Sequence, residues 1–314
     1  MTTHTTPPRI IVICGPTGTG KTAAAITTAQ AIGAEIVSAD SMQIYRYMDI
    51  GTAKPSLEEQ SLIRHHLIDI VNPDEAFDAR KYAVMAGDAI QSIMSRNRTV
   101  LVVGGTGLYI RALLHGLFTL ENGDDRIRSR LKQKASLEGL DCLYAELKQC
   151  DPESANRIHP NDTYRIIRAL EIFETTGIPM SELHQRHGFS TEIFAAGMIG
   201  LYRQKELLYE RIDSRVDQML QAGFIQEVQS LLDRGYSSTL KSMKSLGYRH
   251  MADHLEGRLP LSEAVPAMKR DTRRYAKRQM TWFRSEKNIQ WIDAANTDAV
   301  KKAAEDYLAM NADT

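Results

Sequence analysis

The stretch with the clearest chemical potential is residues 15–22, GPTGTGKT, which fits the spacing G-x-x-x-x-G-K-[ST] of a phosphate-binding loop. Successive backbone N–H groups of such a loop point toward an anion, and its glycines let the backbone approach that anion. Lys21 would add a point charge, and the hydroxyl of Thr22 is placed to bind Mg²⁺. The predicted phosphate-binding residues are Gly15, Pro16, Thr17, Gly18, Thr19, Gly20, Lys21 and Thr22. The pattern predicts bound phosphates without identifying the molecule that carries them.

The second candidate is Asp40, which ends the short run EIVSAD. Nucleotide hydrolases and kinases usually hold their metal with an Asp at the end of a later apolar strand. The later run here, TVLVVGG at 99–105, ends in glycines, which argues against an ATPase and leaves a small-molecule kinase open. Two roles fit Asp40: it could cap a turn or a helix, or it could face the phosphates as a general base.

These residues fall at the ends of predicted strands. Apolar, β-branched runs predict strands at residues 9–14, 35–40, 99–105, 198–202 and 288–293. Their alternation with predicted helices indicates an α/β fold with a parallel sheet flanked by helices, as in P-loop NTPase cores. Such sheets bind ligands at the carboxyl ends of their strands, which is where Gly15, Asp40 and Gly105 fall.

The strand pattern stops after about residue 120. Residues 121–155 have the composition of a helical hairpin, and 156–177 predict another helix, with Asn161 or Asp162 as its N-cap and Gly177 as its stop. The predicted domains are an α/β core of residues 1–119 and 191–314 and an inserted all-helical domain of residues 120–190.

The overall composition is that of a globular protein without a global attraction to polyanions. The 314 residues are 43% hydrophobic, and 39 basic residues balance 39 acidic ones. A polar N-terminal segment without a long apolar run predicts a cytoplasmic protein with no membrane span. The three cysteines have no C-x-x-C spacing, and the adjacent His65 and His66 lack the spacing of a helical metal pair, so we read both histidines as structural.

Positive charge is nevertheless concentrated near the C-terminus. Residues 269–287 contain eight Lys or Arg against two acidic residues, with aromatic residues between them. The helical spacing places Arg270, Arg273, Arg274, Lys277 and Arg278 on one face, opposite Met268, Tyr275, Gln279 and Trp282. This is a local footprint for a polyanion such as RNA, with a solvated amphipathic helix as the alternative.

Further motifs accompany the phosphate loop along most of the chain. They are SADSMQIYRYMDIGTAKP (38–55), HHLIDI (65–70), GGTGLY (104–109), DPESANRIHPNDTYRIIRALEI (151–172), RIDSRVDQM (211–219), LGYR (246–249) and TRRYAKRQMTWFR (272–284). Each motif alone is modest. In this order they closely resemble the tRNA dimethylallyltransferases, or tRNA isopentenyltransferases, and the lack of a zinc-finger tail resembles the bacterial type.

This resemblance implies an enzyme that transfers a dimethylallyl group from dimethylallyl diphosphate to the N6 amine of an adenosine. The acceptor would be adenosine 37, 3′ to the anticodon in tRNAs that read codons beginning with U, and the products would be N6-(dimethylallyl)adenosine and pyrophosphate. The implied partners are tRNA, through its anticodon stem-loop, and dimethylallyl diphosphate, with Mg²⁺ as cofactor and a monomer as the acting form. The phosphate loop would then grip the diphosphate of an isoprenoid, which needs no nucleoside.

The same resemblance implies roles for individual residues. Asp40 would be the general base, while Lys21 and Thr22, with Mg²⁺, would stabilise the departing diphosphate. Arg215 would approach that diphosphate. Thr106 would lie near the reacting centre, with a structural turn as the alternative role.

The resemblance also implies contacts with tRNA. The implied tRNA-binding residues are Asp40, Ser41, Met42, Gln43, Thr106, Arg128, Tyr164, Arg165, Ile166, Ile167, Arg168, Lys244, Ser245, Leu246, Gly247, Tyr248 and Arg249. Arg128 and Arg168 fall in predicted helices, where a solvated helix face is the alternative. The acceptor adenine would have to flip out of its stack to reach a diphosphate channel.

Three other functions compete with this hypothesis. An adenylate isopentenyltransferase would share the phosphate loop and Asp40, but it would need neither a helical insertion nor a basic helix. A P-loop kinase of small molecules lacks its expected acidic residue after LVV. A non-catalytic RNA-binding module would have no use for a complete phosphate loop.

Overall fold

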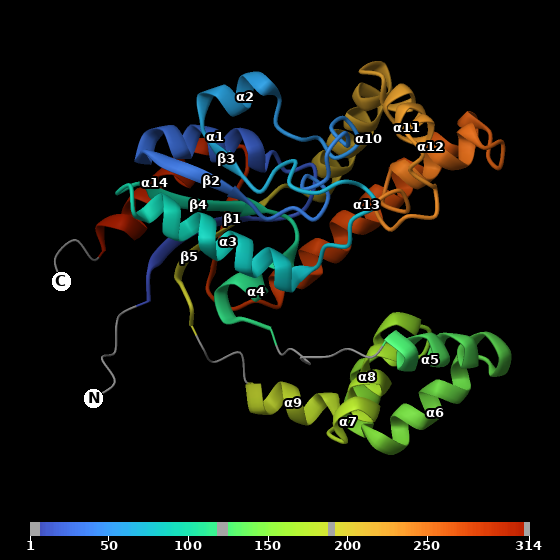
Figure 1. Cartoon of the computed structure of the whole chain (residues 1–314). Helices are drawn as coiled ribbons and strands as arrows, with labels where there is room; N and C mark the ends of the chain where they lie inside the picture. Colours follow the sequence, from blue (N-terminus) through green and yellow to red (C-terminus); the bar gives the residue numbers. More distant parts are fainter. Residues whose placement is uncertain (1–6, 118–124, 188–191, 311–314) are drawn as a thin grey trace, which may run out of the picture. The chain divides into compact units, whose positions relative to one another are not determined.

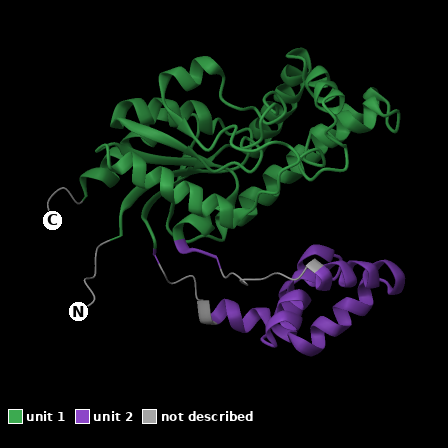
Figure 2. Cartoon of the chain, in the orientation of Figure 1, with its two compact units in different colours: residues 1–114, 193–314 green, residues 115–192 purple. Residues whose placement is uncertain are grey.

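The computed structural model describes residues 7–117, 125–187 and 192–310 (Figure 1). The chain divides into two compact units (Figure 2). Unit 1 comprises Met1–Leu114 and Ile193–Thr314, and unit 2 comprises His115–Glu192. The predicted domain limits were residues 120 and 190, so the division lies a few residues outside them.

Unit 1 is built on a six-stranded sheet in the order β3-β2-β4-β1-β5-β6, and all of its strand pairs are parallel. The strands are β1 (Arg9–Cys14), β2 (Ala34–Ser38), β3 (His65–His66), β4 (Thr99–Gly104), β5 (Ala195–Tyr202) and β6 (Ile289–Asp293). Every predicted strand is present, and the short β3 is an addition that the sequence did not signal. The predicted α/β fold with a parallel sheet is confirmed.

Both faces of the sheet are covered by helices, which explains why its central strands are continuous apolar runs. The helices of unit 1 are α1 (Lys21–Ile32), α2 (Leu57–Leu62), α3 (Ala79–Met94), α4 (Gly107–His115), α10 (Lys205–Gln221), α11 (Phe224–Asp233), α12 (Tyr248–Leu255), α13 (Leu261–Arg284) and α14 (Thr297–Ala309). α1 and α14 pack together over one face, where Ile11 and Ile13 join their core, and α3 covers the other face (Figure 1).

Unit 2 is all-helical among its described residues. It contains α5 (Asp125–Glu138), α6 (Leu140–Cys150), α7 (Pro152–Arg157), α8 (Thr163–Thr176) and α9 (Met180–His187). Its own core is centred on Leu131, Leu143, Leu147 and Ile166, each of which is fully buried. The helix predicted within 156–177 begins at Thr163, directly after Asp162, which was one of its two predicted N-caps and accepts a hydrogen bond from the Arg165 N–H. It ends at Thr176, before the predicted stop Gly177.

Candidate active site at the carboxyl edge of the sheet

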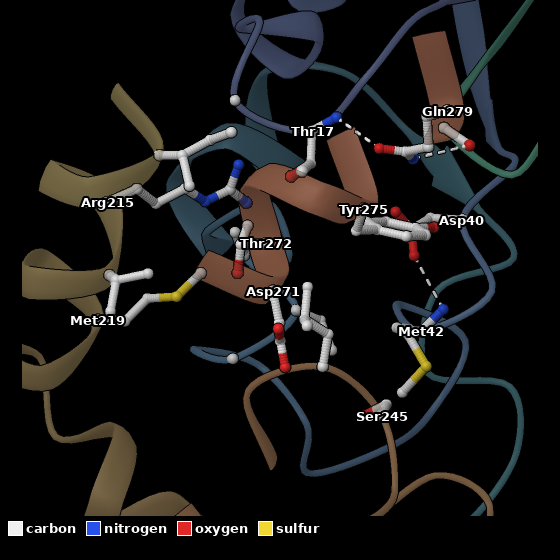
Figure 3. A pocket seen from close by; sticks show the side chains of 18 of the residues that line it. Thr17, Asp40, Met42, Arg215, Met219, Ser245, Asp271, Thr272, Tyr275 and Gln279 are labelled. Carbon is white, nitrogen blue, oxygen red and sulfur yellow. Dashed lines mark hydrogen bonds between the residues drawn. The ribbon is translucent and has the colours of Figure 1, made fainter. Parts of the chain in front are cut away.

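A pocket of about 680 Å³ lined by many polar side chains lies at the carboxyl ends of the strands. The segment after β1 supplies Lys21, the segment after β2 supplies Asp40, and the segment after β4 supplies Gly105. Helices α10 and α13 supply the facing wall, which includes Arg215 and Tyr275 (Figure 3). The predicted position of the site is therefore where the pocket lies.

The phosphate loop has the backbone that its sequence predicts. Gly15, Gly18 and Gly20 all adopt positive φ, and α1 begins directly afterwards at Lys21. At two of these positions there is also no room for a side chain. A Cβ atom would lie 2.5 Å from the Leu201 carbonyl oxygen at Gly15 and 2.9 Å from a side-chain carbon of Ile212 at Gly18.

Two arginines hold the outer side of this loop. Arg203 donates from Nε to the Thr19 carbonyl oxygen at 3.0 Å, and Arg211 donates from Nε to the Gly18 carbonyl oxygen at 3.1 Å. Because these carbonyl groups are engaged outside the pocket, the loop is held in one conformation while two guanidinium charges raise the potential for an anion. Neither arginine was predicted from the sequence, although Arg203 directly follows the end of β5, and residues of ligand sites gather at strand ends.

Two cations face the pocket from opposite walls. Lys21 donates from Nζ to the Pro16 carbonyl oxygen at 2.8 Å. Desolvation lowers the pKa of Lys21 to about 8, a shift that the Asp40 carboxylate opposes and Arg215 reinforces. Desolvation also lowers the pKa of Arg215, against the opposing effect of Asp40. Lys21 and Arg215 are thus desolvated cations that are only partly neutralised by Asp40, and such cations favour the binding of an anion.

Asp40 caps a turn and also lines the pocket, and its role as a general base stays a prediction. Its Oδ1 accepts hydrogen bonds from the backbone N–H groups of Met42 at 2.8 Å and Gln43 at 3.4 Å, so it caps the turn after β2. The carboxylate also lines the pocket, with the Tyr275 ring beside it (Figure 3). Burial raises the pKa of Tyr275, and the charge of Asp40 adds to that shift, so this phenol stays neutral.

Thr106 has a clear structural role. Its hydroxyl accepts a hydrogen bond from the Ser41 N–H at 3.0 Å, and its own N–H donates to the Ala39 carbonyl oxygen at 3.1 Å. It thereby joins the end of β4 to the turn that carries Asp40. The hydroxyl binds Ser41, the residue that follows Asp40. A structural role for Thr106 in this turn therefore does not conflict with a position close to Asp40.

The implied tRNA-binding residues of unit 1 mostly gather at the same pocket. Those that line it are Asp40, Ser41, Met42, Gln43, Ser245, Leu246, Tyr248 and Arg249. Lys244 is exposed, and Gly247 is buried with φ +89°. Tyr248 is fully buried, and its hydroxyl donates to Glu227 at 2.5 Å, so it supports the pocket wall.

The implied tRNA-binding residues of unit 2 divide into two groups. Tyr164 is 80% exposed, and Arg165 is exposed as well, so both are available to a partner. Arg128 and Arg168 both pair with Glu171, which is fully buried. The side chains of Ile166 and Ile167 are 0% and 5% exposed in the core of the unit, so their prediction as contact residues needs correction: they hold α8 in place.

The basic helix α13 lines the pocket as well as carrying exposed basic residues. Arg273 pairs with Asp213 at 2.6 Å, while Arg274 and Arg278 line the pocket. Arg270, Arg274, Lys277 and Arg278 are exposed, and Gln279 is buried on the opposite side of the helix as predicted. The contacts of this helix with the pocket were not predicted, because helical spacing alone does not show which neighbours surround a helix.

The described residues contain no group of three or more His, Cys, Asp or Glu side chains that could hold a metal ion. His65 contacts the Ile63 carbonyl oxygen, and His66 contacts Glu35 at 2.7 Å, as structural histidines would. None of the helices in the part of the chain that the structure describes is long and apolar enough to cross a membrane.

The fold and the pocket together define an α/β protein of the P-loop type whose loop lies beside a pocket with two desolvated cations. The chain belongs to the IPP transferase family, whose model matches residues 43–286. It is 51% identical to the tRNA dimethylallyltransferase of Desulfosudis oleivorans over 288 residues, which cover 92% of each chain. It is 49% identical to that of Desulfatibacillum aliphaticivorans over 300 residues, covering 96% of this chain and 98% of the relative.

Solved structures show the same likeness. The full-length tRNA isopentenylpyrophosphate transferase from Bacillus halodurans matches with a TM-score of 0.72 and 39% identity, covering 96% of each chain. A eukaryotic dimethylallyltransferase acting on tRNA matches with a TM-score of 0.80 and 29% identity, covering 96% of this chain and 80% of that one.

Proposed function

We propose that this chain transfers a dimethylallyl group from dimethylallyl diphosphate to the N6 amine of adenosine 37 in tRNAs that read codons beginning with U. The observation that carries the proposal is the pocket, which joins a complete phosphate loop to the strand-end carboxylate Asp40. The names of the relatives support the reaction class, since they are tRNA dimethylallyltransferases at about half identity over nearly the whole chain.

The proposed reaction assigns each bond to a part of the pocket. The bond between the allylic carbon and the diphosphate oxygen breaks while the bond from that carbon to N6 forms. Asp40 takes the proton that N6 loses, which helps because an aromatic exocyclic amine is a poor nucleophile. Lys21, Arg215 and the loop N–H groups would receive the growing negative charge on the departing pyrophosphate.

The donor set fits Mg²⁺ as the proposed cofactor. Mg²⁺ usually keeps several waters and binds one or two protein oxygens together with substrate phosphates. Thr22 lines the pocket beside Lys21, and its hydroxyl would hold Mg²⁺ together with the diphosphate oxygens. When bound, the ion would neutralise charge on the leaving group.

We further propose that the acceptor is the anticodon stem-loop of tRNA and that a cytoplasmic monomer does the chemistry. The phosphate loop, Asp40 and Arg215 line one pocket within unit 1. Exposed Tyr164 and Arg165 on α8 are suited to stack on a splayed base and to bind a phosphate. The pocket itself would receive a flipped adenine.

The test is mass spectrometry of tRNA nucleosides after incubation with dimethylallyl diphosphate and Mg²⁺. We expect N6-(dimethylallyl)adenosine and pyrophosphate to appear in equal amounts. Transfer to free adenosine monophosphate in preference to tRNA would favour an adenylate isopentenyltransferase. Phosphate release from ATP without any transfer from dimethylallyl diphosphate would favour a kinase or ATPase and would overturn the proposal.

A further inference from the structure

The side-chain amide of Gln279 bridges two walls of the pocket. Its Oε1 accepts a hydrogen bond from the Thr17 N–H at 2.9 Å, and its Nε2 donates to the Gly105 carbonyl oxygen at 2.9 Å (Figure 3). Gln279 is only 8% exposed, although it lies on the basic helix α13. One amide thus joins the phosphate loop after β1 to the segment after β4.

The hydrogen bonds continue from Gly105 toward the proposed general base. Gly105 precedes Thr106, whose hydroxyl accepts from the Ser41 N–H at 3.0 Å. Ser41 follows Asp40, and the Asp40 carboxylate caps the same turn. A continuous path of short contacts therefore runs from the loop that would hold the diphosphate to the carboxylate that would take the proton.

The geometry specifically requires an amide at this position. A carboxylate could accept from the Thr17 N–H, but its second oxygen would face the Gly105 carbonyl oxygen without a proton between them. An apolar side chain would leave one buried donor and one buried acceptor without partners. Gly105 is matched to this amide as well, because a Cβ there would lie 2.5 Å from Gln279 Nε2.

We propose that Gln279 is a positioning residue that fixes the phosphate loop relative to the turn carrying Asp40. The Thr17 N–H donates to Gln279 and so fixes the shape of the loop, while the remaining loop N–H groups are left to bind the diphosphate. The spacing between the donor and the acceptor side of the pocket is then set by one side chain of α13. The expected effect of Gln279 on the transfer rate rests on the proposed transferase activity. Its expected effect on the phosphate loop rests only on anion binding.

The first test compares Gln279→Met, which keeps the length of the side chain and removes both hydrogen bonds, with the wild type. We expect the dissociation constant of magnesium pyrophosphate to rise about 5–100-fold, the range for losing one or two buried hydrogen bonds. The KM for dimethylallyl diphosphate should rise and kcat should fall, while the dissociation constant of tRNA changes by less than about twofold.

The matched control is Phe283→Leu, which loosens a fully buried position one turn further along the same helix and has no hydrogen-bonding side chain. It should lower the melting temperature without changing pyrophosphate affinity. If Gln279→Met likewise lowers only the melting temperature, the inference is wrong. If the wild type binds pyrophosphate but transfers nothing to tRNA, the proposed function fails, while pyrophosphate affinity still tests the loop.

A double-mutant cycle tests the contact with Gly105. Gly105→Ala should displace the Gln279 amide, and Gln279→Ala should remove it, so each single variant weakens pyrophosphate binding. The double variant should be no weaker than the worse single variant, since both changes disrupt one bridge. The remaining approach of the new Cβ to the Gly15 carbonyl oxygen, at 3.3 Å, is common to Gly105→Ala and the double variant and cancels in the cycle. Fully additive losses would contradict the inference.

Discussion

Asp40 caps the turn after β2 and also lines the pocket, where we propose that it acts as the general base. Its Oδ1 is committed to the Met42 N–H at 2.8 Å, which fixes the carboxylate in direction. The group nevertheless faces the pocket, near the cations Lys21 and Arg215 that respond to its charge. A general base gains from such fixation because its position is set before the substrate arrives.

The variant Asp40→Asn tests the proposed base. Asparagine retains an oxygen that can accept from the Met42 N–H, so the turn should survive while basicity is lost. We expect single-turnover transfer to slow by about 10²–10⁴-fold, the usual contribution of a positioned general base, with tRNA affinity changed only a few fold. A single-turnover rate near that of the wild type would leave Asp40 as a cap only.

The lowered pKa of Lys21 predicts a pH dependence of diphosphate binding. Its ammonium is charged below about pH 8 and neutral above it in the free protein. Because an anion prefers the charged form, the contribution of Lys21 to pyrophosphate affinity should be constant below that pH and fall as the pH rises through it, by up to about tenfold per pH unit. Lys21→Arg should flatten this decline, since a guanidinium stays protonated. An equal decline in both proteins would show that another group titrates.

At the scale of elements, the sequence predicted what depends on local pattern. The strands, the phosphate loop, the caps of α8 and the place of Asp40 follow from periodicity, glycine spacing and strand order, and they are confirmed by the fold. The contacts of α13 do not follow in that way. Its bonds to the phosphate loop and to Gly105 join residues more than a hundred positions apart, and a helical repeat carries no information about such partners.

The basic residues of α13 differ in whether they line the pocket. Lys277, Arg274 and Arg278 are all exposed, and of these three the two arginines line the pocket. Lys277→Gln should weaken tRNA binding for all substrate tRNAs alike and reduce the slope of log affinity against log salt by about 0.7–0.9, because one phosphate contact is lost. Turnover at saturating tRNA should not change. Salt titrations of binding measure both effects.

The matched control for this prediction is Lys302→Gln, which removes an exposed charge from α14 on the covered face of the sheet. It should leave the salt slope unaltered. If both variants change the slope equally, the effect is one of net charge. If neither does, the exposed side of α13 is a solvated helix face.

At the scale of the whole molecule, the two units have separate cores. The core of unit 2 is made by residues of α5 to α8, and one core of unit 1 is made by the sheet with α1 and α14. Because each unit buries its own apolar residues, a substitution that destabilises the core of unit 2 need not unfold the pocket in unit 1. The phosphate loop and the residues lining the pocket all belong to unit 1.

Leu143→Ala tests this independence. Leu143 is fully buried in unit 2, and truncating it should destabilise that unit by about 2–5 kcal/mol. Hydrogen exchange should accelerate in α5 to α8, and pyrophosphate affinity should be preserved while tRNA affinity falls. Leu101→Ala, at a fully buried position of the sheet, is the comparison and should impair pyrophosphate binding as well. Loss of pyrophosphate binding in Leu143→Ala would show that the units unfold together.

The bond between Thr17 and Gln279 also bears on how the protein is made. Protein synthesis delivers the phosphate loop among the first residues, whereas α13 leaves the ribosome more than two hundred residues later. The central strand β1 must likewise wait for β5, its neighbour in the sheet. Folding of the site is thus delayed until translation is nearly complete, and a nascent chain carries the loop without the helix that closes it. An interrupted polypeptide would contain the GPTGTGKT motif without a finished pocket.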